Sequence, residues 1–124
     1  MARILVVDDN AVNNDLMLYL LRAFGHEVEG AADGLAGLAA ARRGGFDLVL
    51  TDVLMPGIDG YELARRMKSD PHLAATPLVA VTALAMSGDR ERVTAAGFDG
   101  YIAKPIEPQS FAAQIAAYLP RPSR

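Results

Sequence analysis

Short apolar runs alternate along the chain with longer segments of helical periodicity, and the pair repeats five times in 124 residues. Uninterrupted apolar runs are typical of strands buried on both faces. Strands joined through helices predict a parallel sheet with right-handed crossovers. The strands are expected at 4–7, 27–31, 48–50, 78–81 and 101–103, and the helices at 12–24, 35–43, 59–69, 87–96 and 111–119.

This repeat predicts an α/β fold: a doubly wound five-stranded parallel sheet in the order 2-1-3-4-5, flavodoxin-like, of the (βα)5 type. The length suits a single domain, which we expect to occupy residues 1–119. Residues 120–124 are then a terminal tail or the start of a linker.

The first helical segment has an apolar series at four-residue intervals, which predicts the face that packs on the sheet. The series is Val12, Leu16, Leu20 and Phe24. Three further apolar side chains lie outside it, namely Met17, Leu18 and Leu21. These either are covered by flanking elements or form a docking surface for a kinase, and the sequence leaves both open.

Composition excludes several classes of protein. There is no cysteine, so disulfides, thiolate nucleophiles and cysteine-bound zinc are excluded, and two histidines cannot build a histidine-rich metal site. Lys and Arg number 12 against 15 Asp and Glu, which does not suggest direct binding of nucleic acid. No apolar run is long enough to span a membrane, and we expect a cytoplasmic protein.

Polar side chains follow four of the five expected strands. Asp8 and Asp9 follow the first, Asp52 the third, Thr82 the fourth and Lys104 the fifth. Each alone is open to a structural explanation as a cap, a turn residue or a solvated side chain. Ligands of such sheets bind outside the carboxyl ends of the strands. Polar side chains that follow four strands at this one edge therefore predict a binding site.

Three carboxylates at one site repel one another and require a cation. Oxygen ligands without histidine or cysteine favour Mg²⁺, with Mn²⁺ as the alternative. A lysine and a threonine hydroxyl add donors suited to a tetrahedral dianion. That dianion is either free phosphate or a phosphoryl group held covalently on an aspartate.

From about residue 3 to 119 the chain resembles the response-regulator receiver domains of two-component signalling, the CheY-like family. The resemblance rests on Asp8-Asp9, the stretch 51–60 with Asp52 and Pro56-Gly57, Val81-Thr82-Ala83 and Tyr101–Pro105. The block from Thr82 to Pro105 also resembles receivers of hybrid kinases and stand-alone regulators of cell polarity.

The resemblance implies a role for each matching position. Asp52 is the expected phosphoacceptor. The expected Mg²⁺ ligands are Asp9, Asp52, the backbone carbonyl of Leu54 and, through water, Asp8. The expected phosphoryl-binding residues are Thr82, Ala83 and Lys104. Thr82 and Tyr101 are the expected switch residues, and the bond before Pro105 is expected to be cis.

The resemblance also implies a function. We expect a phosphoacceptor switch that takes its phosphoryl group from a sensor histidine kinase or a histidine phosphotransfer protein and then binds a downstream protein. Such a protein is not an enzyme beyond its own phosphotransfer and slow self-dephosphorylation. The expected output surface comprises the fourth helix, fifth strand and fifth helix, with Ala85, Met86, Arg90, Tyr101, Gln114 and Tyr118.

Three other functions fit the residues less well. A phosphatase of the haloacid-dehalogenase type needs an acid two residues after its nucleophile, where this chain has Leu54. A flavin phosphate would be repelled by Asp8-Asp9. A receiver-like scaffold that is never phosphorylated usually lacks an acid or the lysine. Leu54 and Leu84 flank the expected path of attacking water and cannot orient it, which predicts slow hydrolysis of the acyl phosphate.

Overall fold

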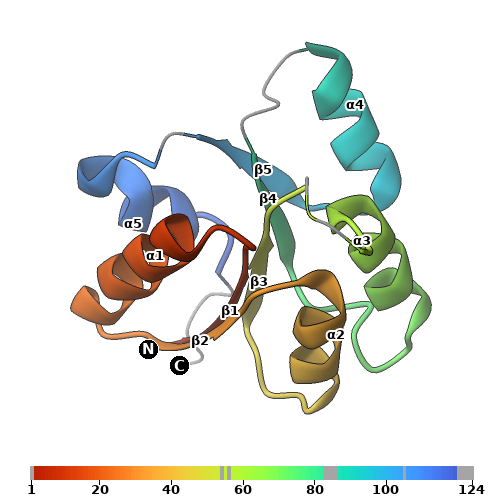
Figure 1. The fold of residues 1–124 in the computed structure, drawn as a ribbon, viewed down its shortest axis with the longest axis horizontal. Helices are drawn as coiled ribbons and strands as arrows, with labels where there is room; N and C mark the ends of the chain where they lie inside the picture. The colour runs from red at the N-terminus through yellow and green to blue at the C-terminus, as the bar shows by residue number, and fades with distance from the viewer. Residues whose placement is uncertain (1, 54, 56, 83–86, 105, 120–124) are drawn as a thin grey trace.

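The computed structural model describes residues 2–53, 55, 57–82, 87–104 and 106–119, with backbone alone at 87–90. Strands and helices alternate strictly through this part of the chain (Figure 1). No helix among the described residues is long and apolar enough to cross a membrane. The elements are β1 (Arg3–Val7), α1 (Ala11–Ala23), β2 (Glu27–Ala31), α2 (Gly34–Arg42), β3 (Leu48–Thr51), α3 (Gly60–Ser69), β4 (Leu78–Thr82), α4 (Ser87–Ala96), β5 (Gly100–Ala103) and α5 (Pro108–Ala116).

All strands of this sheet run parallel, in the order β2-β1-β3-β4-β5. The predicted doubly wound α/β fold is therefore confirmed. The chain leaves β1 for β2 on one side and continues to β3 on the other. Strand order thus reverses between β1 and β3, and their carboxyl ends form the edge where such folds bind ligands.

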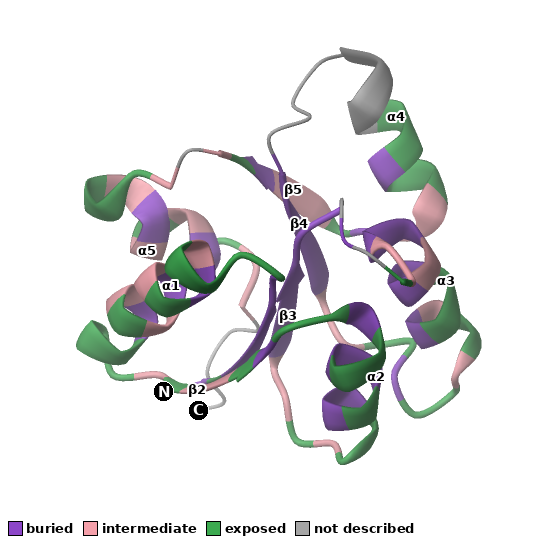
Figure 2. Cartoon of the chain, viewed as in Figure 1, coloured by how far each residue is buried: buried purple, intermediate pink, exposed green. Residues whose placement is uncertain are grey.

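Side chains of the central strands alternate between two apolar layers. In β1, Ile4 and Val6 enter one layer while Leu5 and Val7 enter the other. Helices α1 and α5 cover the first face, and α2, α3 and α4 cover the second (Figure 1). Figure 2 shows the buried strands between these helices. Burial on both faces explains why the strands read as continuous apolar runs.

The predicted packing face of α1 is wrong at both ends of its series, although Leu20 within it packs against the core. Val12 is 77% exposed and Phe24 is also exposed, whereas Met17 and Leu21 are buried at 1% and 0%. A helix turns by about 100° per residue, so side chains at four-residue intervals rotate by about 40° around the helix at each step. Such a series therefore does not stay on one face. Spacings of three and four alternate along the buried face, which is formed by Asn14, Met17 and Leu21.

The final helix begins and ends three residues earlier than the expected 111–119. Pro108 occupies its first turn, where the missing N–H costs no hydrogen bond. Phe111 and Ile115 are fully buried, as their spacing predicts. Leu119 lies beyond the helix and packs against the same layer. The expected tail, 120–124, lies outside the described residues.

Candidate functional site

Strand register brings the predicted site residues to one edge of the sheet. Val7 pairs with Thr51, so Asp8 and Asp52 follow neighbouring positions in β1 and β3. The N–H of Asp52 also donates to the carbonyl of Val7 at 2.9 Å. On the other side, the N–H of Lys104 donates to the carbonyl of Thr82 at 2.9 Å, which aligns the ends of β4 and β5.

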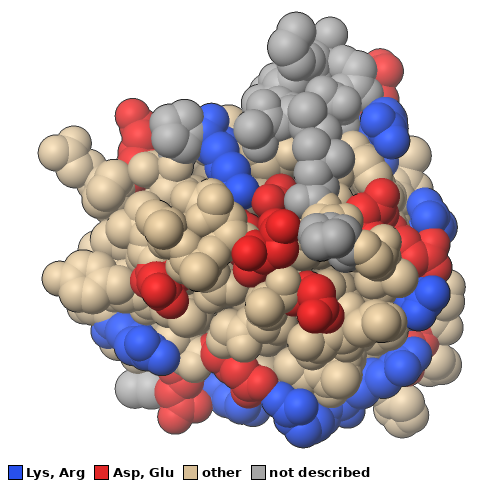
Figure 3. Space-filling model, in the orientation of Figure 1, with Lys and Arg blue, Asp and Glu red and all other residues tan. Residues whose placement is uncertain are grey.

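Three carboxylates meet at this edge. One oxygen from each of Asp8, Asp9 and Asp52 lies within 4.8 Å of the others, in a grouping that could hold a metal ion. Asp8 and Asp52 are buried, whereas Asp9 is exposed. Figure 3 shows acidic side chains gathered at the centre of this face. The site is thus closed toward the sheet and open to solvent beside Asp9.

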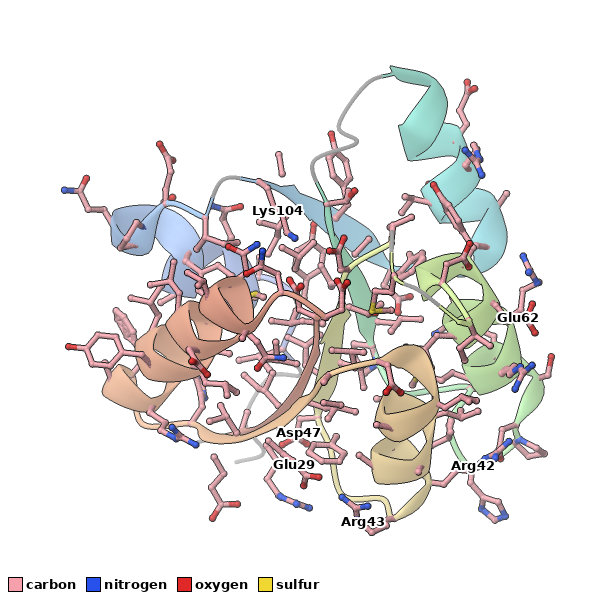
Figure 4. All side chains as sticks on the ribbon, viewed as in Figure 1. Glu29, Arg42, Arg43, Asp47, Glu62 and Lys104 are labelled. Atoms are coloured by element: carbon pink, nitrogen blue, oxygen red, sulfur yellow. The ribbon has the colours of Figure 1, made fainter. Side chains whose placement is uncertain are left out.

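The ammonium group of Lys104 neutralises part of this charge. Its Nζ lies 2.9 Å from Oδ2 of Asp52 and 3.2 Å from Oδ2 of Asp8. The lysine side chain is only 15% exposed, and in Figure 4 it extends from the end of β5 toward the ends of the neighbouring strands. A cation thus already lies among the carboxylates, so the donor set suits positive charge.

Backbone N–H groups orient the same two carboxylates. Oδ1 of Asp8 accepts from the N–H of Asn10 at 2.8 Å, and Oδ1 of Asp52 accepts from the N–H of Val53 at 2.7 Å. The second oxygen of each carboxylate contacts Lys104. Both carboxylates are therefore held from two sides before any ligand binds.

Burial and charge shift two pKa values at the site. Burial raises the pKa of Asp8 above its usual 3.8, and the bond from Asn10 and the charge of Lys104 only partly oppose this. Burial disfavours the charged form of Lys104, but its hydrogen bond and charge interaction with Asp52, together with the charge of Asp8, outweigh burial and raise its pKa. The lysine therefore remains an ammonium group.

The other predicted site residues are described only in part. Thr82 ends β4 and is buried, and Tyr101 is half-buried and packs against the layer under α2, α3 and α4. Ala103 pairs with Thr82 across the two strands. Outside the described residues lie Leu54, Ala83, Leu84 and Pro105.

Sequence reasoning missed two residues next to the site. Gly60 begins α3, and its N–H donates to the carbonyl of Val53 at 2.8 Å, directly after Asp52. Asn14 has a buried side chain that bonds to the carbonyl of Asp8. Gly60 ends the stretch 51–60 that carries the resemblance, but its role depends on a close approach in space that the sequence does not reveal. For Asn14, a polar residue at helical spacing from Met17 and Leu21 was a usable signal.

A doubly wound parallel sheet with a carboxylate cluster and a lysine at its switch point defines a class of protein: α/β domains that handle a phosphoryl group beside a hard divalent cation. Oxygen-only donors fit Mg²⁺ and do not fit a soft metal.

Residues 4–116 match the response regulator receiver domain family, and the chain belongs to that family. It is 39% identical over 116 residues to the polar-differentiation response regulator DivK of Brucella anthropi, covering 94% of each protein. It is therefore a signalling receiver of two-component systems rather than a classical enzyme, and its partner is a histidine kinase.

Solved structures agree with this assignment. The chemotaxis protein CheY4 of Vibrio cholerae superposes with a TM-score of 0.91 at 30% identity, covering 96% of this chain and 99% of that one. The receiver domain of the sensor histidine kinase PA1611 from Pseudomonas aeruginosa superposes with a TM-score of 0.86 at 33% identity, over 94% and 96% of the chains. That structure has a magnesium ion coordinated in its active-site cleft.

Proposed function

We propose that Asp52 is the phosphoacceptor. A carboxylate oxygen of Asp52 attacks the phosphorus of a phosphohistidine, the new P–O bond replaces the P–N bond, and the imidazole nitrogen leaves. The observation that carries this is the position of Asp52: it follows a central strand, its carboxylate is clustered with those of Asp8 and Asp9, and it contacts the ammonium of Lys104.

We further propose that Mg²⁺, or Mn²⁺, is held by Asp9, Asp52 and the backbone carbonyl of Leu54, with Asp8 acting through water. Such an ion, when bound, neutralises charge on the phosphoryl oxygens. The exposed carboxylate of Asp9 supports this set because it is the side of the cluster open to solvent. Asp8, which is buried and already bonded to Asn10 and Lys104, suits an indirect role.

Once Asp52 is modified, Thr82, Ala83 and Lys104 bind the phosphoryl oxygens. The new bonds from Thr82 and Lys104 to a charged group contribute about 3–6 kcal/mol together. Inverting a conformational equilibrium from 1:99 to 99:1 needs about 5.5 kcal/mol, so the unmodified protein should already sample the active state. We propose that Tyr101 follows the movement of Thr82. The bond before Pro105, which we expect to be cis, lies outside the described residues.

The test of the acceptor is incubation with Mg²⁺ and a small acyl phosphate or phosphoramidate donor, read by intact-mass spectrometry. The parent chain should gain the mass of one phosphoryl group and Asp52→Asn should not. Asp15→Asn, which removes an exposed carboxylate of α1, is the matched control and should be modified like the parent. Modification of Asp52→Asn to the parent's extent would overturn the assignment.

The coupling has its own test. Thr82→Ala should accept the phosphoryl group, but the protein should not change to its active conformation, because the hydroxyl that binds the phosphoryl oxygen is gone. Fully phosphorylated Thr82→Ala protein that binds its target like the parent contradicts this role.

We propose that the kinase or phosphotransfer protein docks on α1, through side chains other than those first expected. Met17 and Leu21 are core residues. The exposed apolar side chains of this helix and its end are Val12, Tyr19 and Phe24. Val12 lies in the first turn of α1, close behind Asp8-Asp9. A partner seated on this end of the helix therefore has its histidine near the carboxylates.

Tyr19→Arg tests the docking surface. It should slow phosphotransfer from a histidine kinase while modification by a small donor is unchanged, because only the protein donor needs the surface. Ala39→Arg, at an exposed position of α2, controls for the added charge. Equal slowing with both donors would mean a damaged site rather than a damaged docking surface.

The output surface is proposed on α4, β5 and α5. Of its expected members, Tyr101, Gln114 and Tyr118 are half-buried, while Ala85 and Met86, and the side chain of Arg90, lie outside the described residues. We also propose a cytoplasmic location and a domain at 1–119.

Release of phosphate from purified phosphorylated protein tests the slow hydrolysis expected from Leu54 and Leu84, and a lifetime of seconds contradicts it.

A further inference from the structure

A polar side chain lies in the buried face of α1. Asn14 is only 8% exposed and precedes Met17 and Leu21 on that face. Burying an amide costs free energy unless its polar atoms are hydrogen-bonded. A leucine would fill such a position more simply, so the amide requires a reason.

The amide bonds to the carboxyl ends of two strands. Its Nδ2 donates to the carbonyl of Asp8 and to the carbonyl of Ala31, each at 3.1 Å. Asp8 directly follows β1, and Ala31 ends β2. One side chain of α1 thus joins the helix to both strand ends beside the acidic site.

Strand β2 leaves room for this amide at Gly30. A Cβ atom at that position would lie 2.7 Å from Oδ1 of Asn14 and 3.1 Å from Cδ1 of Leu18. The first distance is shorter than real Cβ contacts, so a larger residue at Gly30 would displace the amide. Asn14 and Gly30 therefore act as a matched pair.

Joining the two strands does not by itself require Asn14. The N–H of Asp8 already donates to the carbonyl of Ala31 at 3.1 Å. What the amide adds is the bond to the carbonyl of Asp8. That carbonyl belongs to the planar peptide unit between Asp8 and Asp9, so fixing its oxygen also fixes the direction in which the backbone enters Asp9.

We propose that Asn14 is a positioning residue: by holding the Asp8–Asp9 peptide, it sets the two carboxylates for a divalent cation. This inference rests on the proposed function of the acidic site. Groups that orient metal ligands typically change metal affinity about 10- to 100-fold when they are removed.

The experiment measures Mg²⁺ affinity by isothermal titration calorimetry and, separately, the free energy of unfolding in chelator. Asn14→Ala should bind Mg²⁺ about tenfold more weakly than the parent. Asn13→Ala, at the neighbouring half-buried position, should bind Mg²⁺ like the parent. A packing role alone would lower the free energy of unfolding of Asn14→Ala and leave the Mg²⁺ affinity of the folded protein unchanged.

Gly30→Ala supplies an independent perturbation, because it displaces the amide without touching Asp8 or Asp9. It should also weaken Mg²⁺ binding, and it should add no further loss in the Asn14→Ala background, since the amide is then absent. Should Asn14→Ala fail to fold, Gly30→Ala decides alone.

The outcomes distinguish a failure of this inference from a failure of the proposed function of the acidic site. Parent-like Mg²⁺ affinity in folded Asn14→Ala, or in Gly30→Ala when Asn14→Ala does not fold, overturns the role of Asn14 and leaves the proposed function intact. Additive losses in the double variant also overturn it. A parent chain that binds no Mg²⁺ overturns both.

Discussion

Gly60 lies against the backbone of Asp52 so closely that any side chain at this position would force the backbone to move. A Cβ atom at Gly60 would lie 2.3 Å from the carbonyl oxygen of Asp52 and 2.7 Å from Cα of Val53. That carbonyl also accepts from the hydroxyl of Thr51 at 2.9 Å. The start of α3 and the loop that carries Asp52 therefore form one packed unit.

Gly60→Ala should damage stability and phosphorylation together. The atoms in the way are backbone atoms, so relief of the clash must move Asp52, and overpacking of this kind costs about 1–3 kcal/mol. Chemical denaturation and intact-mass spectrometry measure the two effects. Gly25→Ala is the control: it imposes a left-handed φ of 87° on alanine but meets nothing within 4 Å. It should lose stability and keep normal phosphorylation.

Lys104→Met should destabilise the protein in chelator by roughly 3 kcal/mol, because it leaves the buried carboxylates of Asp8 and Asp52 without their cation. The pKa of Asp8, already raised by burial, should rise further. Saturating Mg²⁺ should restore more stability to this variant than it adds to the parent. Thermal unfolding with and without Mg²⁺ measures both effects.

Lys68→Met is the control for Lys104→Met. Lys68 donates to the carbonyls of Ala74 and Thr76 and pairs with Asp99. Thr76 and Asp99 precede β4 and β5, so this group lies at the opposite edge of the sheet from the acidic cluster. Loss of Lys68 should also lower stability, but Mg²⁺ should stabilise this variant no more than it stabilises the parent. Equal rescue of both lysine variants would show that Lys104 has no special relation to the metal.

Stability should fall as the pH drops through about 6.5, the ordinary pKa of histidine. Burial lowers the pKa of His26 below that value, and its Nδ1 accepts from the N–H of Ala2 at 3.3 Å. The unfolded chain therefore takes up a proton more readily than the folded one, which favours unfolding on acidification.

Chemical denaturation at pH values from 5 to 8, on both sides of the ordinary histidine pKa of about 6.5, measures how the free energy of unfolding depends on pH. His26→Gln should flatten the dependence across this range. His72→Gln, at an exposed position after α3, should keep it. A slope that survives in His26→Gln would assign the effect to another group.

Tyr61→Phe should leave the free energy of unfolding unchanged or raise it by about 1 kcal/mol, because an unpaired buried hydroxyl carries a desolvation cost. Among the described residues, the Tyr61 hydroxyl is the one buried side-chain polar atom without a hydrogen-bond partner. The ring contacts with Phe98, at a centroid distance of 6.4 Å, and with the guanidinium of Arg92, at 4.6 Å, remain. Tyr61→Leu removes them and should destabilise. A clear loss in Tyr61→Phe would reveal a partner for the hydroxyl.

The fold was predictable because buried parallel strands carry their own pattern. Once apolar runs such as 4–7 and 48–50 were placed in adjacent strands, the topology alone brought Asp8, Asp52 and Lys104 to one edge. No contact had to be known in advance, since the carboxyl ends of parallel strands coincide by construction.

The packing face of α1 was not predictable from apolar letters. Its buried face includes a polar residue, Asn14, so the face reads as interrupted, whereas the series from Val12 to Phe24, which is exposed at both ends, reads as continuous. The contact of Gly60 with Asp52 was hidden for another reason: it depends on backbone atoms, which leave no mark on residue type beyond the glycine itself.

The ion pairs of Lys104 with Asp8 and Asp52 have a consequence for the living cell. A protein with an internal counterion stays folded when its external one is scarce. We therefore expect a shortage of magnesium to silence this regulator without depleting it, so that signalling resumes from the existing pool as soon as the ion returns.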